Sequence, residues 1–211
     1  MKKKVIELPK GYLSYSQYSL WNQSPERYAA LYFDKREEMR FDNDGMRYGK
    51  EVANALEKGV ETGDLRTDAA MLLLPKYDVA DEEITAEFKT DYGWLKLLGR
   101  PDSFDSKTLS FYEYKTGISP WTQNKASKHF QMQFYAMMIY IIHKRVPPHS
   151  ELIWIETEKD MNGATRPTGV IKRFPVEISL SSVMDTMAKV TKTAHEIEIA
   201  WACHTPYITT F

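Results

Sequence analysis

The stretch LLGRPDSFDSKTLSFYEYKTG, residues 97–117, decides the fold because it sets two acidic residues and a lysine within strand-like sequence. Branched and aromatic residues, which suit a pleated surface, occur on both sides of a short polar segment. That segment, Asp105-Ser106-Lys107, is typical of a hairpin turn. The stretch therefore predicts two antiparallel strands, over 93–104 and 108–116.

Glu113 and Lys115 are two residues apart, so they share one face of the expected strand with the apolar Phe111. Asp102 lies near the end of the preceding strand, and ten residues separate it from Glu113. Strand pairing alone leaves open whether the two carboxylates meet. A bulge or bend near Pro101 is needed to bring them together.

Two carboxylates and a lysine suit a site that hydrolyses a phosphodiester. Mg²⁺ and Mn²⁺ prefer oxygen ligands and often bind through one or two carboxylates plus water and phosphate. Lys115 would orient or deprotonate the attacking water, or offset charge in the transition state. An isolated Glu-x-Lys is usually a solvated surface pair, so the residues around it carry the hypothesis.

The rest of the chain predicts an α/β fold, with a mixed sheet flanked by helices. We expect one domain over 1–211, with a helical region over 12–63 that includes a helix over 48–63 closed by Gly63. Ser14 or Ser16 would cap a first helix, and Ser24-Pro25 is typical of the start of a second. The other expected elements are strands over 83–90, 151–158 and 169–178, helices over 126–144 and 180–200, and a loop over 34–44.

Composition sets the class of protein. The 211 residues are 43% hydrophobic and 27% charged, which is ordinary for a globular chain. The net charge of −1 shows no global bias toward nucleic acid, so any DNA contact needs a local basic surface. The basic start lacks the apolar core of a secretory signal, and no apolar run is long enough to span a membrane. We therefore expect a cytoplasmic protein without a membrane partner.

In this setting the sequence resembles the PD-(D/E)XK nuclease superfamily, and within it the RecB-like exonuclease branch. The resemblance runs over about residues 14–140 and weakens toward the C-terminus. It is carried by Pro101-Asp102, by Glu113-Tyr114-Lys115 within EYKTG, and by Gln131 and Tyr135 within QMQFYA. The resemblance implies a restriction-endonuclease-like fold.

It also implies roles for these residues. Asp102, Glu113 and the backbone carbonyl at Tyr114 would bind Mg²⁺ or Mn²⁺, and Lys115 would act on the water. Gln131 would hydrogen-bond nucleic acid or a water at the metal, and Tyr135, one helical turn further on, would steady the site.

Two departures from the family pattern matter. Where relatives carry a metal-binding histidine on the helix before the sheet, GKEVANALE has Ala53. Glu57, one turn on, would supply a replacement carboxylate or remain a rim glutamate. Some relatives hold an iron–sulfur cluster with four cysteines, but here Ser24 takes the early position and the chain has only Cys203. One thiolate does not hold such a cluster, so we expect no iron–sulfur centre and a colourless protein.

Three basic residues near the motifs have two interpretations each. Lys125 and Lys128 either contact DNA phosphates or form a solvated first turn of the helix that carries Gln131. Arg100, beside the Pro-Asp pair, either contacts phosphate or pairs with a nearby acid.

The expected function is that of a metal-dependent DNA nuclease, an exonuclease serving recombination, repair or phage DNA processing. Its DNA would be a duplex end or a single strand, with a recombinase or annealing protein as a possible partner. Two alternatives stay open: a DNA- or protein-binding module that has lost cleavage, and a structure-selective endonuclease or junction resolvase on the same fold.

Overall fold

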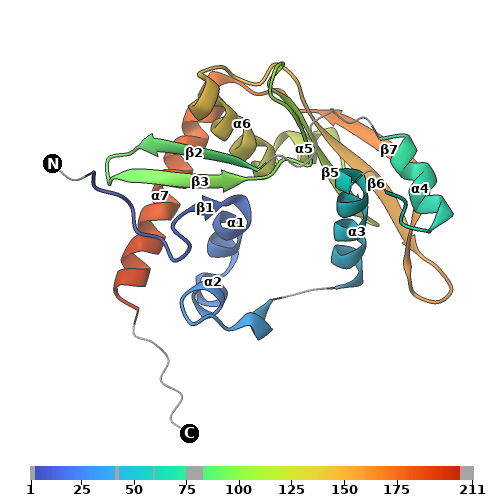
Figure 1. Cartoon of the computed structure of the whole chain (residues 1–211), viewed down its shortest axis with the longest axis horizontal. Coiled ribbons are helices and arrows are strands. Elements are labelled where there is room, and N and C mark those ends of the chain that lie inside the picture. The colour runs from blue at the N-terminus through green and yellow to red at the C-terminus, as the bar shows by residue number, and fades with distance from the viewer. Residues whose placement is uncertain (1–2, 41–42, 59, 75–82, 205–211) are drawn as a thin grey trace, which may run out of the picture.

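The computed structural model describes residues 3–40, 43–58, 60–74 and 83–204. Within them the chain is a mixed α/β fold with strands in two sheets (Figure 1). The helices are α1 (Tyr15–Gln23), α2 (Pro25–Tyr32), the 3₁₀ turn η1 (Glu37–Met39), α3 (Asp44–Lys58), α4 (Leu65–Leu72), α5 (Gln123–Ser127), α6 (Phe130–His143) and α7 (Leu180–Ala202). No helix in this part of the chain is long and apolar enough to cross a membrane.

The smaller sheet has the order β1-β3-β2, and the larger has the order β4-β5-β6-β7. In the larger sheet β5 and β6 run parallel, while the pairs β4/β5 and β6/β7 are antiparallel. The strand bounds are β1 (Leu13–Ser14), β2 (Ile84–Lys89), β3 (Trp94–Gly99), β4 (Ser103–Asp105), β5 (Ser110–Gly117), β6 (Ser150–Lys159) and β7 (Thr165–Pro175). The chain therefore has two mixed sheets where the sequence predicted one.

The expected strand over 93–104 is divided. β3 ends at Gly99, and the chain resumes as β4 in the other sheet. Pro101 lies in the break, because proline has no N–H to continue a ladder. The carbonyl of Arg100 instead accepts a hydrogen bond from the Tyr135 hydroxyl at 2.9 Å. The bend that the sequence required near Pro101 is thus a change of sheet.

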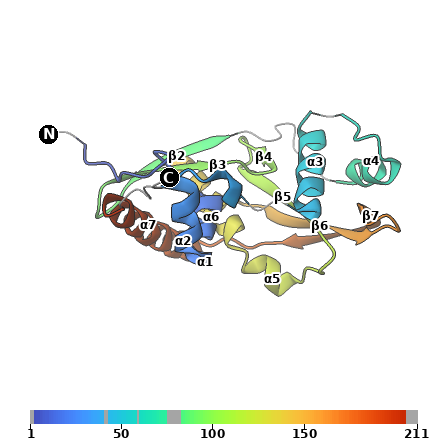
Figure 2. The ribbon, with the colours of Figure 1, turned by 90° about the horizontal axis from the view of Figure 1, so that it is seen from below.

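Alternation along β5 places its side chains in two separate cores. Phe111 belongs to the larger core, which includes the buried face of α6, whereas Tyr112 packs with Tyr48 and Val52 of α3. Figure 2 shows α3 and α5 on opposite faces of this sheet. Because both faces are covered, the position of each β5 side chain is fixed by register.

Helix boundaries depend on local capping. Ser14 caps α1, and Ser24 caps α2 with Pro25 at its first position, as predicted. The helix expected over 48–63 instead begins at Asp44, because the Asn43 side chain accepts a hydrogen bond from the Met46 amide at 2.9 Å. Its last residue is Lys58, so Gly63 does not close it. Helix α4, capped by Asp64, was not predicted.

The helix expected over 126–144 is two helices. Thr122 caps the short α5, and His129 has an extended backbone, so α6 begins only at Phe130. Lys125 is therefore in α5, and Lys128 lies in the connection rather than in the helix that carries Gln131. The segment expected to be a loop over 34–44 contains the turn η1 and the first residue of α3.

Gly99 marks the closest approach of β3 to α6. A Cβ added there would lie 2.7 Å from Met138 Sδ and 3.1 Å from Tyr135 Cε1. Both side chains belong to the buried face of α6. The absence of a side chain at Gly99 therefore lets the helix reach the end of the strand, where Tyr135 binds the carbonyl of Arg100.

We expect Gly99→Ala to lower the free energy of unfolding by about 1–3 kcal/mol, because α6 must shift to admit the methyl group. Gly117→Ala is the matched control, since a Cβ at Gly117 meets no atom within 4 Å. The control should stay within about 0.5 kcal/mol of wild type. Urea denaturation of the three proteins measures this, and equal stabilities for the two variants would contradict the packing described.

Candidate active site

The site forms where β4 and β5 run side by side and α6 begins. Asp102 lies just before β4, and its Oδ2 accepts a hydrogen bond from the Tyr114 backbone amide at 2.7 Å. Glu113 and Lys115 project from the same face of β5, and Lys115 Nζ is 2.6 Å from Glu113 Oε1. The structure therefore brings together the acid pair and the lysine that the sequence singled out.

Helix α6 adds an amide and a phenol to this group. Gln131 Nε2 donates to Glu113 Oε1 at 2.5 Å, and Gln131 Oε1 accepts from Lys115 Nζ at 2.9 Å. Gln131 Nε2 also donates to the Tyr135 hydroxyl at 3.0 Å. Since the Tyr135 hydroxyl donates to the carbonyl of Arg100, one hydrogen-bond network joins α6, β5 and the segment between β3 and β4.

One oxygen of this network has no partner. Glu113 is only 2% exposed, and its Oε2 is buried without a hydrogen bond among the described residues. Burying an unpaired carboxylate oxygen is costly, and such atoms often mark the place of an ion or ligand. Because Glu113 Oε2 has no partner, it is available as an oxygen ligand, and in this respect the residues fit a divalent cation.

The donor set consists of two carboxylates, those of Asp102 and Glu113. Among the described residues no three His, Cys, Asp or Glu side chains gather as a metal site. Mg²⁺ needs only one or two protein carboxylates, because water and substrate phosphate complete its shell. Asp102 and Glu113, with oxygen as their only donor atom, fit this requirement. Glu57 lies in α3, but its side chain is outside the described part of the chain.

Burial controls the charges of the three central groups. Burial, and then the charge of Asp102, raises the pKa of Glu113 from its ordinary value of 4.5 to about 8. Burial also raises the pKa of Asp102, although Lys115 opposes the shift. For Lys115, burial favours the neutral form, but the charges of Glu113 and Asp102 outweigh it and the pKa is raised. Lys115 is therefore an ammonium ion near neutral pH.

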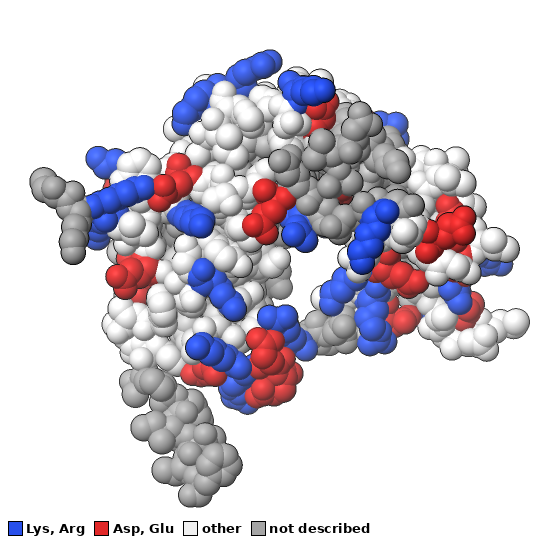
Figure 3. All heavy atoms as spheres, in the orientation of Figure 1, with Lys and Arg blue, Asp and Glu red and all other residues white. Residues whose placement is uncertain are grey.

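A groove lies beside this network, between α1 and α3. One part, of about 690 Å³, is lined by Lys115 and Gln131 from the site together with Tyr15 of α1 and Lys50 of α3. A second part, of about 510 Å³, is lined by Trp121 and Lys125. The two parts share six lining residues, namely Asn43, Gly45, Thr116, Gly117, Thr157 and Thr165. Figure 3 shows an opening in this face bordered by Lys and Arg side chains, with acidic ones interspersed.

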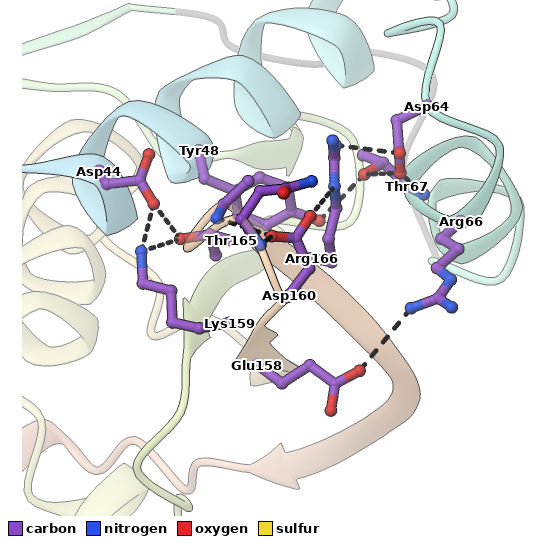
Figure 4. A network of polar contacts seen from close by, with 12 residues as sticks. Asp44, Tyr48, Asp64, Arg66, Thr67, Glu158, Lys159, Asp160, Thr165 and Arg166 are labelled. Atoms are coloured by element: carbon purple, nitrogen blue, oxygen red, sulfur yellow. Dashed lines mark hydrogen bonds and ion pairs between the residues drawn. The ribbon is translucent and has the colours of Figure 1, made fainter.

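A polar network holds the groove wall formed by α3 against the β6–β7 hairpin (Figure 4). Asp44 accepts hydrogen bonds from Lys159 and, at 2.6 Å, from Thr165. The bond from Lys159, and then the one from Thr165, lowers the pKa of Asp44 to about 2. Further from the groove, Arg166 bridges Asp64 at 2.9 Å and Asp160 at 3.5 Å. Asp44 is thus a structural anion that offsets the charge of Lys159, and the other charged residues of the groove lining are Lys50, Lys115 and Lys125.

The remaining basic residues of the sequence prediction differ in position. Lys125 lines the groove, whereas Lys128 and Arg100 are exposed and are not among its lining residues. Arg100 lies 3.8 Å from Glu83, which corresponds to the alternative of pairing with an acid. Trp121 and the Asp44–Lys159–Thr165 cluster were missed by the sequence reasoning. Trp121 carried a weak signal, because it follows EYKTG by only four residues.

Comparison with known proteins adds little to this site. No protein-family model matches the chain, and no curated protein sequence matches it. Six chains of solved structures are similar. One, described as "Crystal structure of SSO0001", has a TM-score of 0.41 and 11% identity over 96% of this chain and 82% of that one. A likeness at this score supports no statement about function.

The raised pKa of Glu113 makes stability depend on pH. Between pH 6.5 and 8 the folded protein keeps a proton on Glu113 that the unfolded chain has released, so stability falls as pH rises. His129, whose pKa burial lowers from 6.5 to about 4, opposes this loss only weakly, because its unfolded imidazole is half protonated at pH 6.5 and almost neutral at pH 8. We expect a loss of at most about 2 kcal/mol.

Thermal unfolding of metal-free protein at the two pH values measures the loss. Glu113→Gln, which cannot titrate, should remove most of the slope. Added Mg²⁺ or Mn²⁺ should raise the unfolding temperature more at pH 8, because the ion competes with the proton for Glu113. A metal-free protein that is as stable at pH 8 as at pH 6.5 would contradict the assignment.

Proposed function

We propose that this protein is a divalent-metal-dependent DNA nuclease that hydrolyses phosphodiester bonds on a restriction-endonuclease-like α/β fold. The observation that carries the proposal is the convergence of Asp102 and Glu113, with one buried and unpartnered oxygen, beside Lys115 on a basic groove. The resemblance of the Pro-Asp and Glu-Tyr-Lys motifs to the RecB-like branch supports the same reaction class.

Asp102 and Glu113 would hold Mg²⁺ or Mn²⁺, which when bound supplies Lewis acidity and offsets the charge of the phosphate. The Tyr114 amide fixes the orientation of the Asp102 carboxylate, and Gln131 and Lys115 fix Glu113 through its other oxygen. These contacts leave Glu113 Oε2 as the oxygen available to a cation. The chain thus positions its acids before any substrate arrives.

Lys115 would stabilise charge rather than take a proton. Its pKa is raised, so a neutral amine that could act as a base is scarce near neutral pH. Its ammonium group donates to Glu113 and Gln131 and lines the groove, where it would meet a phosphate oxygen that gains negative charge during hydrolysis. Gln131, bonded to both Lys115 and Glu113, keeps the two side chains at a fixed separation. Of the roles that the sequence left open, charge stabilisation fits this environment best.

The resemblance favours an exonuclease, and its partners would be DNA and a recombinase or annealing protein. A second function keeps support from one observation. Only two acids converge among the described residues, and Ala53 stands where relatives carry a histidine ligand. A module that binds DNA without cutting it would have the same groove and a weaker metal site.

Incubation of end-labelled single-stranded and duplex DNA with Mg²⁺ or Mn²⁺ tests the proposal. We expect release of labelled nucleotides that EDTA abolishes, with linear DNA digested and circular DNA resistant. Lys115→Ala should lower the rate by at least about 100-fold, as loss of a charge-stabilising donor does. Lys107→Ala, an exposed lysine in the β4–β5 turn, is the matched control and should cleave at the wild-type rate.

Circular dichroism must show that the Lys115→Ala protein is folded. Binding to DNA with no metal-dependent release of nucleotides would favour the binding module. Cutting of circular or branched DNA would favour the structure-selective endonuclease.

A further inference from the structure

The part of the groove beyond Lys115 ends at an aromatic wall that the proposed hydrolysis does not use. Trp121 is half-buried there, and Lys125 Nζ lies 4.2 Å from the centre of its ring. Ile118, 58% exposed, lies on the same stretch of chain and also lines this part. An indole with a cation above it, in a groove that the core does not fill, is a typical stacking surface for a nucleobase.

We propose that Trp121 and Lys125 form a subsite for an unpaired nucleotide, with the base stacked on the indole and the adjoining phosphate held by the ammonium group. The inference rests on the proposed function, because it names the nucleic acid that this groove takes as single-stranded next to the scissile bond. Lys125 would leave the face of the indole when the base arrives and would pair with the backbone instead.

Continuity of the groove connects the subsite to the acid pair. Thr116 and Gly117 follow Lys115 on β5 and line both parts of the groove. A Cβ added to Gly117 would meet no atom within 4 Å, so the space above this residue is open. A strand with a phosphate beside Lys115 would therefore run along the end of β5, past the residues that both parts share, toward Trp121.

The ring of His129 packs against the indole. The His129 ring lies 5.1 Å from the Trp121 ring at an interplanar angle of 68°, and it also meets the Tyr15 ring edge-on at 6.0 Å. Since burial lowers the pKa of His129 to about 4, this histidine is neutral and adds no charge near neutral pH. Lys125 is therefore the cation that the structure places on the stacking surface.

The depth of the acid pair favours an unpaired strand. Glu113 is 2% exposed and Lys115 is 26% exposed, so a phosphate must enter the groove to reach them. Within a duplex the faces of each base are covered by its stacked neighbours, so an indole beside the backbone has no free base face to meet. A single strand is flexible and offers both a phosphate and a free base face within one nucleotide.

The test measures binding apart from cleavage. In EDTA, fluorescence anisotropy would follow wild-type protein with labelled oligothymidylate and with an otherwise identical abasic oligonucleotide. We expect oligothymidylate to bind more tightly, and Trp121→Ala to weaken its binding by about 5- to 100-fold while hardly changing abasic binding. Trp121→Phe should retain most of the affinity, and Trp201→Ala, which changes a 37%-exposed tryptophan on α7, should retain all of it.

Further variants locate the subsite in the groove. Lys125→Ala should weaken binding and reduce its salt dependence by about one counterion, whereas Lys128→Ala, three residues away and not among the groove-lining residues, should do neither. Gly117→Leu would fill the junction of the two parts and should weaken single-strand binding as well.

The outcomes separate this subsite from the proposed hydrolysis. Equal affinity of wild type for the abasic and normal strands, or Trp121→Ala binding as tightly as wild type, overturns the subsite even if the enzyme cleaves DNA. Base-dependent binding lost in Trp121→Ala supports the subsite even if no metal ion elicits cleavage. If Trp121→Ala does not fold, Trp121→Phe and the wild-type comparison of the two oligonucleotides still decide the question.

Discussion

The buried position of Glu113 is the constraint on which the rest of the site depends. A carboxylate with so little access to water is expensive to charge, and Asp102 beside it increases the cost. Lys115 compensates for part of that cost, and Gln131 fixes the geometry of the pair. The oxygen that remains unpaired is where the proposed cation would bind, and such binding would offset the cost of burying the charge.

The sequence predicted β2, β5 and β6 and the side chains of β5 that share a face, because periodicity along a strand depends on few other contacts. Glu113 and Lys115 lie two apart in β5, so their common direction followed from the pleat alone. The pairing of β4 with β5 also followed, since Asp105 caps its own turn through the Lys107 amide at 2.8 Å. What remained open was where Asp102 would point. Its position depends on the change of sheet at Pro101 and on a hydrogen bond to a distant backbone amide.

Other features depended on contacts that no local pattern encodes. Helices α3 and α4 begin at the local caps Asn43 and Asp64, but both helices also make polar contacts with the distant β6–β7 hairpin, including the ion pair of Arg166 with Asp64. The division of the expected long helix at His129 depends on an extended backbone in a run of residues that all favour helix. That division matters for the site, because it moves Lys125 to α5 and onto the groove while α6 carries Gln131. Restriction-endonuclease-like topology and nuclease chemistry remain proposals supported by the residues that meet here.

The two halves of the eight-residue strand β5 lie in different environments. Residues 110–113 are buried, and residues 114–117 become progressively part of the groove wall. The side chains of the first half must therefore fit the volume of the two cores, whereas those of the second half determine the shape of the groove. Substitutions at Thr116 and Gly117 alone would change the groove without disturbing either core, since neither residue is buried and Gly117 has no side chain. Along β5, the residues that stabilise the cores are thus separate from those that line the groove, and Glu113 and Lys115 lie where the two sets meet.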